Sequence, residues 1–377
     1  NIAIPANAEA NDQSIGSVAI DTDNIIGSIS LMGGKIDNIR LKKFNQELDA
    51  SSGLVKILSP IGSEKPYYVH NGWVGNQNIE VELPNEKSIW TNLSKNALTA
   101  SSPVLLEWNN GNGLTFKKKI EVDNNFLFTI TQSIENNTTK DYTFYPYSLA
   151  SRHGLPDDYT DFFVLHEGFI GVLGDEGEIR ADYNDIAKES ESFENIEGGW
   201  LGFTDKNWAT VIVPPKNMPY QGRFTSLSNG SIYQVDYLGN GQTVYASNII
   251  EVTSHVFAGA KQVNILDSYE DNYGLIKFDL LVDWGWFYFL TKPLFYLLQW
   301  LYGILGNYGL SILGVTIIIK IIFFPLANKA YVSMSSMKKL QPEMLNIREK
   351  YKNDRAKQQQ AIVEIYKKEK VNPLSGC

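Results

Sequence analysis

The chain has 377 residues, enough for more than one domain, and 42 acidic against 33 basic side chains give it a net charge of −9. Its single cysteine, Cys377, excludes an internal disulfide framework and any cysteine-rich metal site. The four histidines (His70, His153, His166 and His255) show no ligand spacing, so no metal or other cofactor is predicted.

Charge is distributed unevenly along the chain. Residues 1–282 carry 20 basic and 36 acidic side chains, a net charge of −16, whereas residues 338–370 carry 10 basic and 5 acidic side chains, a net charge of +5. An almost uncharged, aromatic-rich stretch separates the two regions. This order is typical of a membrane protein that follows the positive-inside rule. An acidic globular domain with a basic tail is the alternative that charge alone leaves open.

Residues 1–15 are a polar lead-in, and residues 16–265 have the pattern of β-structure. Apolar residues alternate on both sides of the turn at residues 123–125, at Leu114, Phe116, Ile120, Val122, Phe126, Phe128, Ile130 and Ile134. A period of two predicts a hairpin with one buried face. Further strands are predicted at residues 209–213 and 244–250. The pattern predicts a large antiparallel β-sandwich without a long helix, followed by a linker at residues 266–282.

Residues 283–303 are predicted to form an amphipathic helix that lies in a membrane interface. Nine of these 21 residues are aromatic, and tryptophan and tyrosine prefer a position with one apolar and one wet side. Trp284, Trp286 and Trp300 are the candidate interfacial anchors. Pro293 predicts a kink or a restart of the helix. The core helix of a soluble protein is the alternative.

Residues 307–327 are predicted to form a transmembrane helix. The run from Tyr308 to Leu326 contains nineteen residues, and Lys320 is its only charged residue. At about 1.5 Å per residue, this length matches the roughly 30 Å hydrocarbon core of a bilayer. A buried helix of a soluble protein is the alternative, but such helices are seldom apolar on every face over this length.

Residues 330–370 are predicted to form a cytoplasmic helical hairpin. One apolar stripe follows the first arm, at Met334, Met337, Leu340, Met344, Ile347 and Tyr351. Pro342 predicts a restart or a bend within this arm, and residues 353–354 offer a turn into a second arm. The basic excess places the hairpin in the cytoplasm, close to anionic lipid. A solvated coiled coil is the alternative.

Lys320 is the candidate functional residue. A lone cation near the middle of a span costs about 2.5–3.5 kcal/mol on insertion scales, and the lysine stem is too short to reach far toward either surface. Thr316, four residues earlier, lies on the same helix face. An ammonium and a hydroxyl on one face predict a hydrated groove. A salt bridge to an acidic residue of another membrane helix is the alternative.

A series of short motifs runs through the last quarter of the chain, at residues 282–287, 292–294, 306–309, 325–326, 340–342 and 371–377. In this order the motifs closely resemble the YidC family of bacterial membrane-protein insertases, of the Gram-negative type with a large periplasmic domain. Residues 282–377 match densely, and the run at 371–377 is the most specific. The β-rich region resembles the family's periplasmic domain in outline, at Gly33-Gly34, Leu41, Phe44 and Ser268-Tyr269-Glu270.

The resemblance implies a function and a site. The family inserts and folds integral proteins of the bacterial inner membrane, alone or with the Sec translocase (SecYEG and SecDF). Its five-helix core encloses a hydrophilic groove in which a positive charge, usually an arginine, attracts polar or acidic parts of the incoming segment. Lys320 matches that position, and Thr316 matches a polar groove position. Lysine keeps the charge but lacks the fork of arginine.

The resemblance also implies a topology and a set of partners. Residues 16–303 are expected in the periplasm and residues 330–370 in the cytoplasm of a multi-pass protein. Residues 371–377 are expected to begin the next transmembrane helix, and another helix is expected before Asn1. Nascent membrane proteins, the lipid bilayer, the Sec translocase and, as a further candidate, the ribosome are the implied partners. No catalytic residue and no nucleic-acid specificity are expected.

Two other classes of function stay open. The family's periplasmic fold resembles galactose mutarotase, so a sugar-binding or epimerase-like sandwich is one of them. His153 and His166-Glu167 are its candidate catalytic residues, although nothing pairs them by spacing. The other is a single-span anchor that tethers a structural domain. The anchor hypothesis predicts that Lys320 can be replaced by leucine without loss of function.

Overall fold

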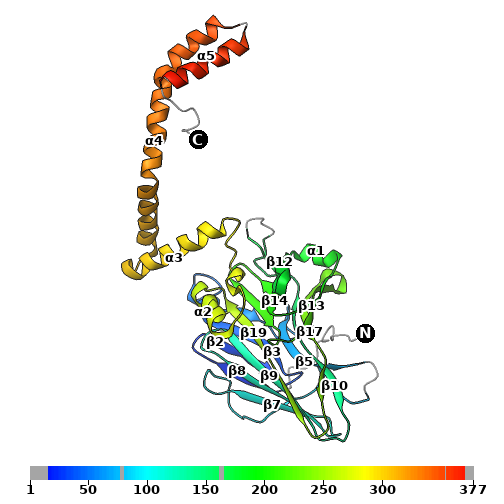
Figure 1. Cartoon of the computed structure of the whole chain (residues 1–377). Coiled ribbons are helices and arrows are strands. Elements are labelled where there is room, and N and C mark those ends of the chain that lie inside the picture. Colours follow the sequence, from blue (N-terminus) through cyan, green and yellow to red (C-terminus); the bar gives the residue numbers. More distant parts are fainter. Residues whose placement is uncertain (1–15, 77–79, 161–164, 353, 370–377) are drawn as a thin grey trace. The chain divides into compact units, whose positions relative to one another are not determined.

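The computed structural model describes residues 16–76, 80–160, 165–352 and 354–369. The chain forms two compact units that divide between Asp283 and Trp284 (Figure 1). The predicted lead-in at residues 1–15, the motif at 371–377 and Cys377 lie outside the described residues.

The first unit is a sandwich of two antiparallel sheets. Ten strands form the first sheet, in the order β1-β2-β3-β5-β10-β17-β16-β13, with β4 paired to β3 and β18 paired to β10. Their bounds are β1 Ser17–Asp21, β2 Ile25–Ser30, β3 Lys35–Asn45, β4 Leu54–Leu58, β5 Tyr67–Gly75, β10 Tyr142–His153, β13 Glu191–Ile196, β16 Tyr220–Leu227, β17 Ile232–Gly239 and β18 Gln242–Val244.

Nine strands form the second sheet, in the order β12-β11-β14-β15-β19-β9-β8-β7-β6. Their bounds are β6 Thr91–Asn92, β7 Val104–Asn109, β8 Leu114–Val122, β9 Leu127–Asn136, β11 Gly168–Leu173, β12 Gly177–Ala181, β14 Gly199–Thr204, β15 Trp208–Val213 and β19 Ile249–Ala260. The predicted hairpin is confirmed, because β8 and β9 pair around residues 123–125 with Val122 opposite Phe128. The strand predicted at residues 209–213 is also confirmed, as β15.

Aromatic side chains from the two sheets meet in the core. Phe116 of β8 lies 6.0 Å from Phe144 of β10, ring centroid to ring centroid, in an edge-to-face arrangement. Phe169 of β11 lies 5.2 Å from Phe224 of β16. Pairs of this kind add about 0.5–1.5 kcal/mol to the free energy of burial, so they hold the sheets face to face. The predicted fold class, a large antiparallel sandwich followed by an apolar helix and a helical region, is confirmed.

One local prediction needs correction. The strand predicted at residues 244–250 is interrupted, because Asn248 N donates to Tyr245 O in a turn (3.1 Å) and Ser247 has a φ of 59° between β18 and β19. A short helix, α1 (Tyr183–Lys188), also lies within the β-rich region. The remaining short elements are the 3₁₀ turns at Ala50–Ser52, Gly174–Glu176 and Ser228–Gly230.

The segment predicted as a linker, residues 266–282, instead packs on the sandwich. It contains most of α2 (Val263–Tyr273) and the 3₁₀ turn Phe278–Leu281. The Tyr269 hydroxyl donates to Asp123 Oδ2 (2.7 Å) and accepts from Phe126 N (3.0 Å), which fixes α2 to the β8–β9 turn. These partners are more than 140 residues away in sequence, so local periodicity does not reveal the contact.

The second unit contains α3 (Tyr288–Leu305), α4 (Tyr308–Lys350) and α5 (Arg355–Lys368). The α3 helix begins five residues after the predicted start and runs through Pro293. The α4 helix runs through Pro342, so of the restart or bend predicted there, the restart does not occur. Figure 1 shows α5 folded back beside the last turns of α4, where Tyr366 Oη donates to Met344 Sδ (3.4 Å).

The contact of α2 with the β8–β9 turn yields a test. Replacing Tyr269 with phenylalanine removes a buried hydroxyl that serves two partners, so the free energy of unfolding should fall by about 1–3 kcal/mol. Urea denaturation of a fragment comprising residues 1–283 measures this change. Tyr273→Phe is the control, because Tyr273 lies in the same helix and is 37% exposed. An equal loss of stability in both variants would contradict the proposed role of the Tyr269 hydroxyl.

Candidate functional site

Among the residues that the structure describes, α4 is the one helix long and apolar enough to cross a membrane. Its 43 residues correspond to about 65 Å, roughly twice the thickness of a hydrocarbon core. Large apolar side chains such as Ile317, Ile321 and Phe324 are 58–67% exposed. A continuous exposed apolar surface of this size requires a cover of lipid or protein.

Lys320 lies on this apolar surface. It is twelve residues after the first residue of α4, about 18 Å along the axis and so near the middle of a span that begins at Tyr308. With Ile317, Ile321 and Phe324 it lines a shallow concavity. No carboxylate within the described part of the chain forms an ion pair with its ammonium group. The charge therefore has apolar neighbours in this chain.

Thr316 lies one helical turn before Lys320 on the same face of α4. Its hydroxyl donates to the carbonyl of Ile312 (2.8 Å), four residues earlier in the helix. This bond satisfies the hydroxyl proton within the helix, so the side chain can face apolar surroundings at low cost. The hydroxyl oxygen still has lone pairs that can accept a further hydrogen bond.

The three predicted anchor tryptophans differ in environment. Trp286 is 89% exposed and Trp300 is 61% exposed. Trp284 is 8% exposed and packs edge-to-face on Phe295, with ring centroids 5.5 Å apart. Thr291 Oγ1 donates to the carbonyl of Trp284 (2.9 Å). Trp286 and Trp300 are thus exposed enough to contact a membrane surface, whereas Trp284 packs against the first turns of α3.

Lys292 belongs to the motif at residues 292–294, but its contact with three aromatic rings was not predicted from the sequence. Its ammonium lies 5.9 Å from the ring centroid of Trp284, 5.6 Å from Tyr288 and 6.0 Å from Tyr296. Cation–π attraction of this kind contributes about 0.5–1 kcal/mol per exposed pair. The i, i±4 spacing of Lys292 from two tyrosines was the available signal.

In the part of the chain that the structure describes, the candidate epimerase residues His166 and Glu167 form hydrogen bonds with different backbone groups and not with each other. His166 Nε2 lies 2.8 Å from the carbonyl oxygen of Phe169. The Glu167 carboxylate is buried and accepts hydrogen bonds from the backbone N–H of Thr160 and of Lys206, both at 3.1 Å. No contact within the described residues joins His153 to either of them. The structure therefore does not assemble these side chains into one acid–base pair.

Two lysines are buried in the sandwich. Lys118 is 2% exposed, donates to the carbonyl of Gly33 (3.1 Å) and lies 4.6 Å from the ring centroid of Trp90. Burial, together with the charge of Lys35, lowers the pKa of Lys118 to about 7. Burial also lowers the pKa of Lys35, which lies over the ring of Tyr68. The alternation of Phe116, Lys118 and Ile120 could have revealed this inward-facing lysine.

Comparisons with known proteins cover both units. Residues 17–297 match the YidC periplasmic domain family, and residues 300–377 match the 60Kd inner membrane protein family. The chain is 44% identical over 371 residues to the membrane protein insertase YidC of Methylobacterium nodulans, covering 96% of this chain and 61% of the relative. It is 42% identical over 362 residues to the corresponding protein of Brucella suis, covering 96% and 59%. The chain thus spans about three fifths of the length of these relatives.

Solved structures to which this chain is similar include two proteins. One is a galactose mutarotase-like protein from Lactobacillus casei, 9% identical with a TM-score of 0.45, which covers 64% of this chain and all of that chain. The other is an active YidC insertase with its first transmembrane domain resolved, 16% identical with a TM-score of 0.33, covering 97% of this chain and 68% of that chain.

The buried Lys118 predicts a specific pH dependence of stability. Its pKa is about 7 when folded and 10.5 ordinarily, so the unfolded chain binds more protons between these values. The free energy of unfolding should therefore rise from pH 7 to pH 10, by an amount on the order of a few kcal/mol. Lys118→Met should flatten this rise, as measured by urea denaturation of residues 1–283 at several pH values.

The control for this experiment is Lys119→Met, because Lys119 is exposed and neighbours Lys118 in the same strand. That variant should keep the slope of the parent. A slope that survives in Lys118→Met would mean that another group is responsible.

Proposed function

Because the chain belongs to the YidC family of membrane protein insertases, we propose that it serves the insertion, folding and assembly of integral membrane proteins. The whole protein would act without the Sec translocase on some substrates and together with it on others. Its substrates would be nascent membrane proteins. The partners SecYEG and SecDF, and the ribosome as a further candidate, are part of this proposal.

The observation that carries the proposal is the ammonium of Lys320 on the apolar surface of α4. A cation at membrane depth is strongly disfavoured in lipid, so its site must be hydrated or must contain a polar partner. A groove formed with further membrane helices would provide such a site. Lys320 and Thr316 would face into this groove, and the exposed isoleucines and phenylalanines on the other faces of α4 would contact lipid or neighbouring helices.

The physical mechanism requires no chemical change in the substrate. A hydrated groove shortens the low-dielectric path that a polar loop must cross, and a fixed positive charge attracts acidic or polar parts of that loop. The apolar segment that follows then leaves the groove for lipid. This last step is favourable because about 20 apolar residues are removed from water.

The remaining elements fit the same proposal. The acidic sandwich and α3 would lie on the periplasmic side, with Trp286 and Trp300 at the interface. The basic hairpin formed by the end of α4 and by α5 would lie in the cytoplasm. Its exposed apolar side chains, including Leu345 and Val363, would receive the arriving segment. The protein would then be a multi-pass component of the bacterial inner membrane.

A substitution at position 320 tests the role of the charge. In the full-length protein, Lys320→Leu should lower the insertion of a small substrate with an acidic translocated loop by at least about tenfold, because one charged contact contributes about 1.5–3 kcal/mol. Lys320→Arg should retain insertion. Protease mapping of the substrate, after depletion of the host's own insertase, measures the inserted fraction.

Lys329→Leu is the matched control, because it removes the same charge from a later position of the same helix. It should insert the substrate nearly as well as the parent. Normal insertion by Lys320→Leu would instead favour the hypothesis that α4 is only an anchor.

The hydrated groove has a test of its own. In a full-length protein whose cysteines are replaced by serine, Lys320→Cys should react with a water-soluble maleimide. Ile322→Cys should not react, because two residues correspond to about 200° around a helix and place it on the opposite, lipid-facing side. Protection of both positions, or equal labelling of both, would contradict a groove on the Lys320 face.

A further inference from the structure

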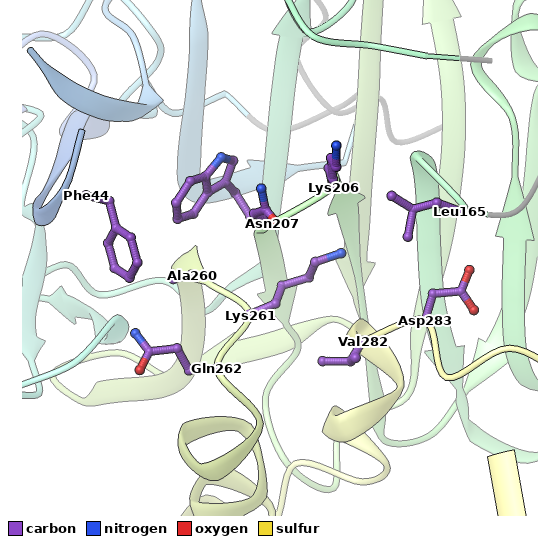
Figure 2. A pocket seen from close by; sticks show the side chains of 10 residues that line it. Phe44, Leu165, Lys206, Asn207, Ala260, Lys261, Gln262, Val282 and Asp283 are labelled. Carbon is purple, nitrogen blue, oxygen red and sulfur yellow. The ribbon is translucent and has the colours of Figure 1, made fainter. Parts of the chain in front are cut away.

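An open cleft lies at one end of the sandwich, within the first unit (Figure 2). Its volume is about 490 Å³, within the range of small-molecule sites. The cleft is formed where the β14–β15 turn, the end of β19, the start of α2 and the last residues of the unit meet. Its lining includes Phe44, Lys206, Trp208, Lys261, Gln262 and Asp283.

One end of this cleft is apolar. Phe44 and Trp208 stand edge to face, with their ring centroids 5.2 Å apart. Figure 2 places Phe44 and Gln262 on one side of the Lys261 side chain, and Leu165 and Asp283 on the other. An aromatic corner next to polar side chains suits a ligand that carries both an apolar and a polar part.

Two lysines, Lys206 and Lys261, also line the cleft. The amine of Lys261 donates to the hydroxyl of Thr204 (3.0 Å), and within the described residues neither it nor Lys206 forms an ion pair. Burial lowers the pKa of Lys261 to about 8. Asp205, Asp283 and Glu167 attract Lys261 electrostatically, but among the described residues none of them forms a direct ion pair with it. The two lysines can therefore contact an anionic ligand directly.

The nearby carboxylates are already engaged. Arg152 forms a bidentate pair with Asp205, at 2.6 and 2.8 Å. Arg180 lies 3.1 Å from Asp283, and Glu167 accepts the backbone N–H of Lys206. Asp205 and Asp283 are thus paired with arginines, and Glu167 is held by a backbone N–H, so within the described residues both lysines lack a direct ion pair and can contact a ligand.

We propose that this cleft binds a phosphate ester with an apolar body, and that the source is the headgroup of an anionic phospholipid. Lys206 and Lys261 would hold the phosphate, and the Phe44–Trp208 corner would contact the apolar part. Val282 and Asp283 line the cleft and directly precede the aromatic segment that begins at Trp284, which favours a membrane source over a soluble one. This choice of source rests on the proposed function, because it takes that segment to lie at a membrane.

Hydrogen–deuterium exchange of the full-length protein tests the proposal. The peptides that cover residues 204–210 and 260–264 should exchange about tenfold more slowly in nanodiscs with phosphatidylglycerol than in nanodiscs of phosphatidylcholine alone, if the lipid is present at ten times its Kd. The double variant Lys206→Gln/Lys261→Gln should lose this difference. Unchanged exchange in β8 and β9 verifies that the double variant is folded.

The matched control is Lys216→Gln/Lys277→Gln, which removes two exposed lysines of the same unit outside the cleft and should keep the protection. Equal protection in both kinds of nanodisc, or protection that survives in the cleft variant, would overturn the site. Protection by glycerol 1-phosphate in detergent, without any by phosphatidylglycerol, would overturn the lipid source. Lys320→Leu should leave the protection unchanged, which separates this result from the proposed insertase activity.

Discussion

The proposed function depends on one free energy, the cost of removing the ammonium group of Lys320 from water. Lys320 is the only charged residue between Tyr308 and Leu326, a run whose large exposed side chains are apolar, and no carboxylate in the described chain forms an ion pair with it. Lipid alone is a poor environment for such a group, whereas lipid is favourable for the residues around it. In the proposed insertase, the same helix would therefore have two environments, a hydrated one on the face of Lys320 and Thr316 and an apolar one elsewhere.

The cost of removing an ammonium group from water also applies inside the sandwich, where Lys118 is buried in the core. The two sheets present aromatic and aliphatic side chains to each other, and the buried ammonium of Lys118 is held by carbonyl oxygens and an aromatic ring, with its pKa lowered. Burial of a lysine in a soluble core is tolerated because the group can lose its proton. In the cleft, Lys261 is less buried and keeps access to the surface, so the group can hold an anionic ligand while charged.

Much of the architecture followed from local pattern. Alternating apolar residues around residues 123–125 predicted the β8–β9 hairpin, since a buried sheet face imposes a period of two. The apolar run from Tyr308 predicted a helix that can cross a membrane, since its length and composition are properties of the sequence itself. The strand predicted at residues 244–250 was wrong because a turn interrupts it, and turn geometry at a serine with positive φ has only a weak local signal.

The sequence by itself determined the order of the β-rich, apolar and basic helical regions, the asymmetry of charge and the place of Lys320, because periodicity, composition and spacing are local properties. Only the tertiary structure decided that residues 266–282 pack on the sandwich, that Lys118 is buried, and that Lys206 and Lys261 line one cleft with Phe44 and Trp208. These contacts join residues far apart in the chain, and their free energy depends on which groups the folded sheets exclude from water.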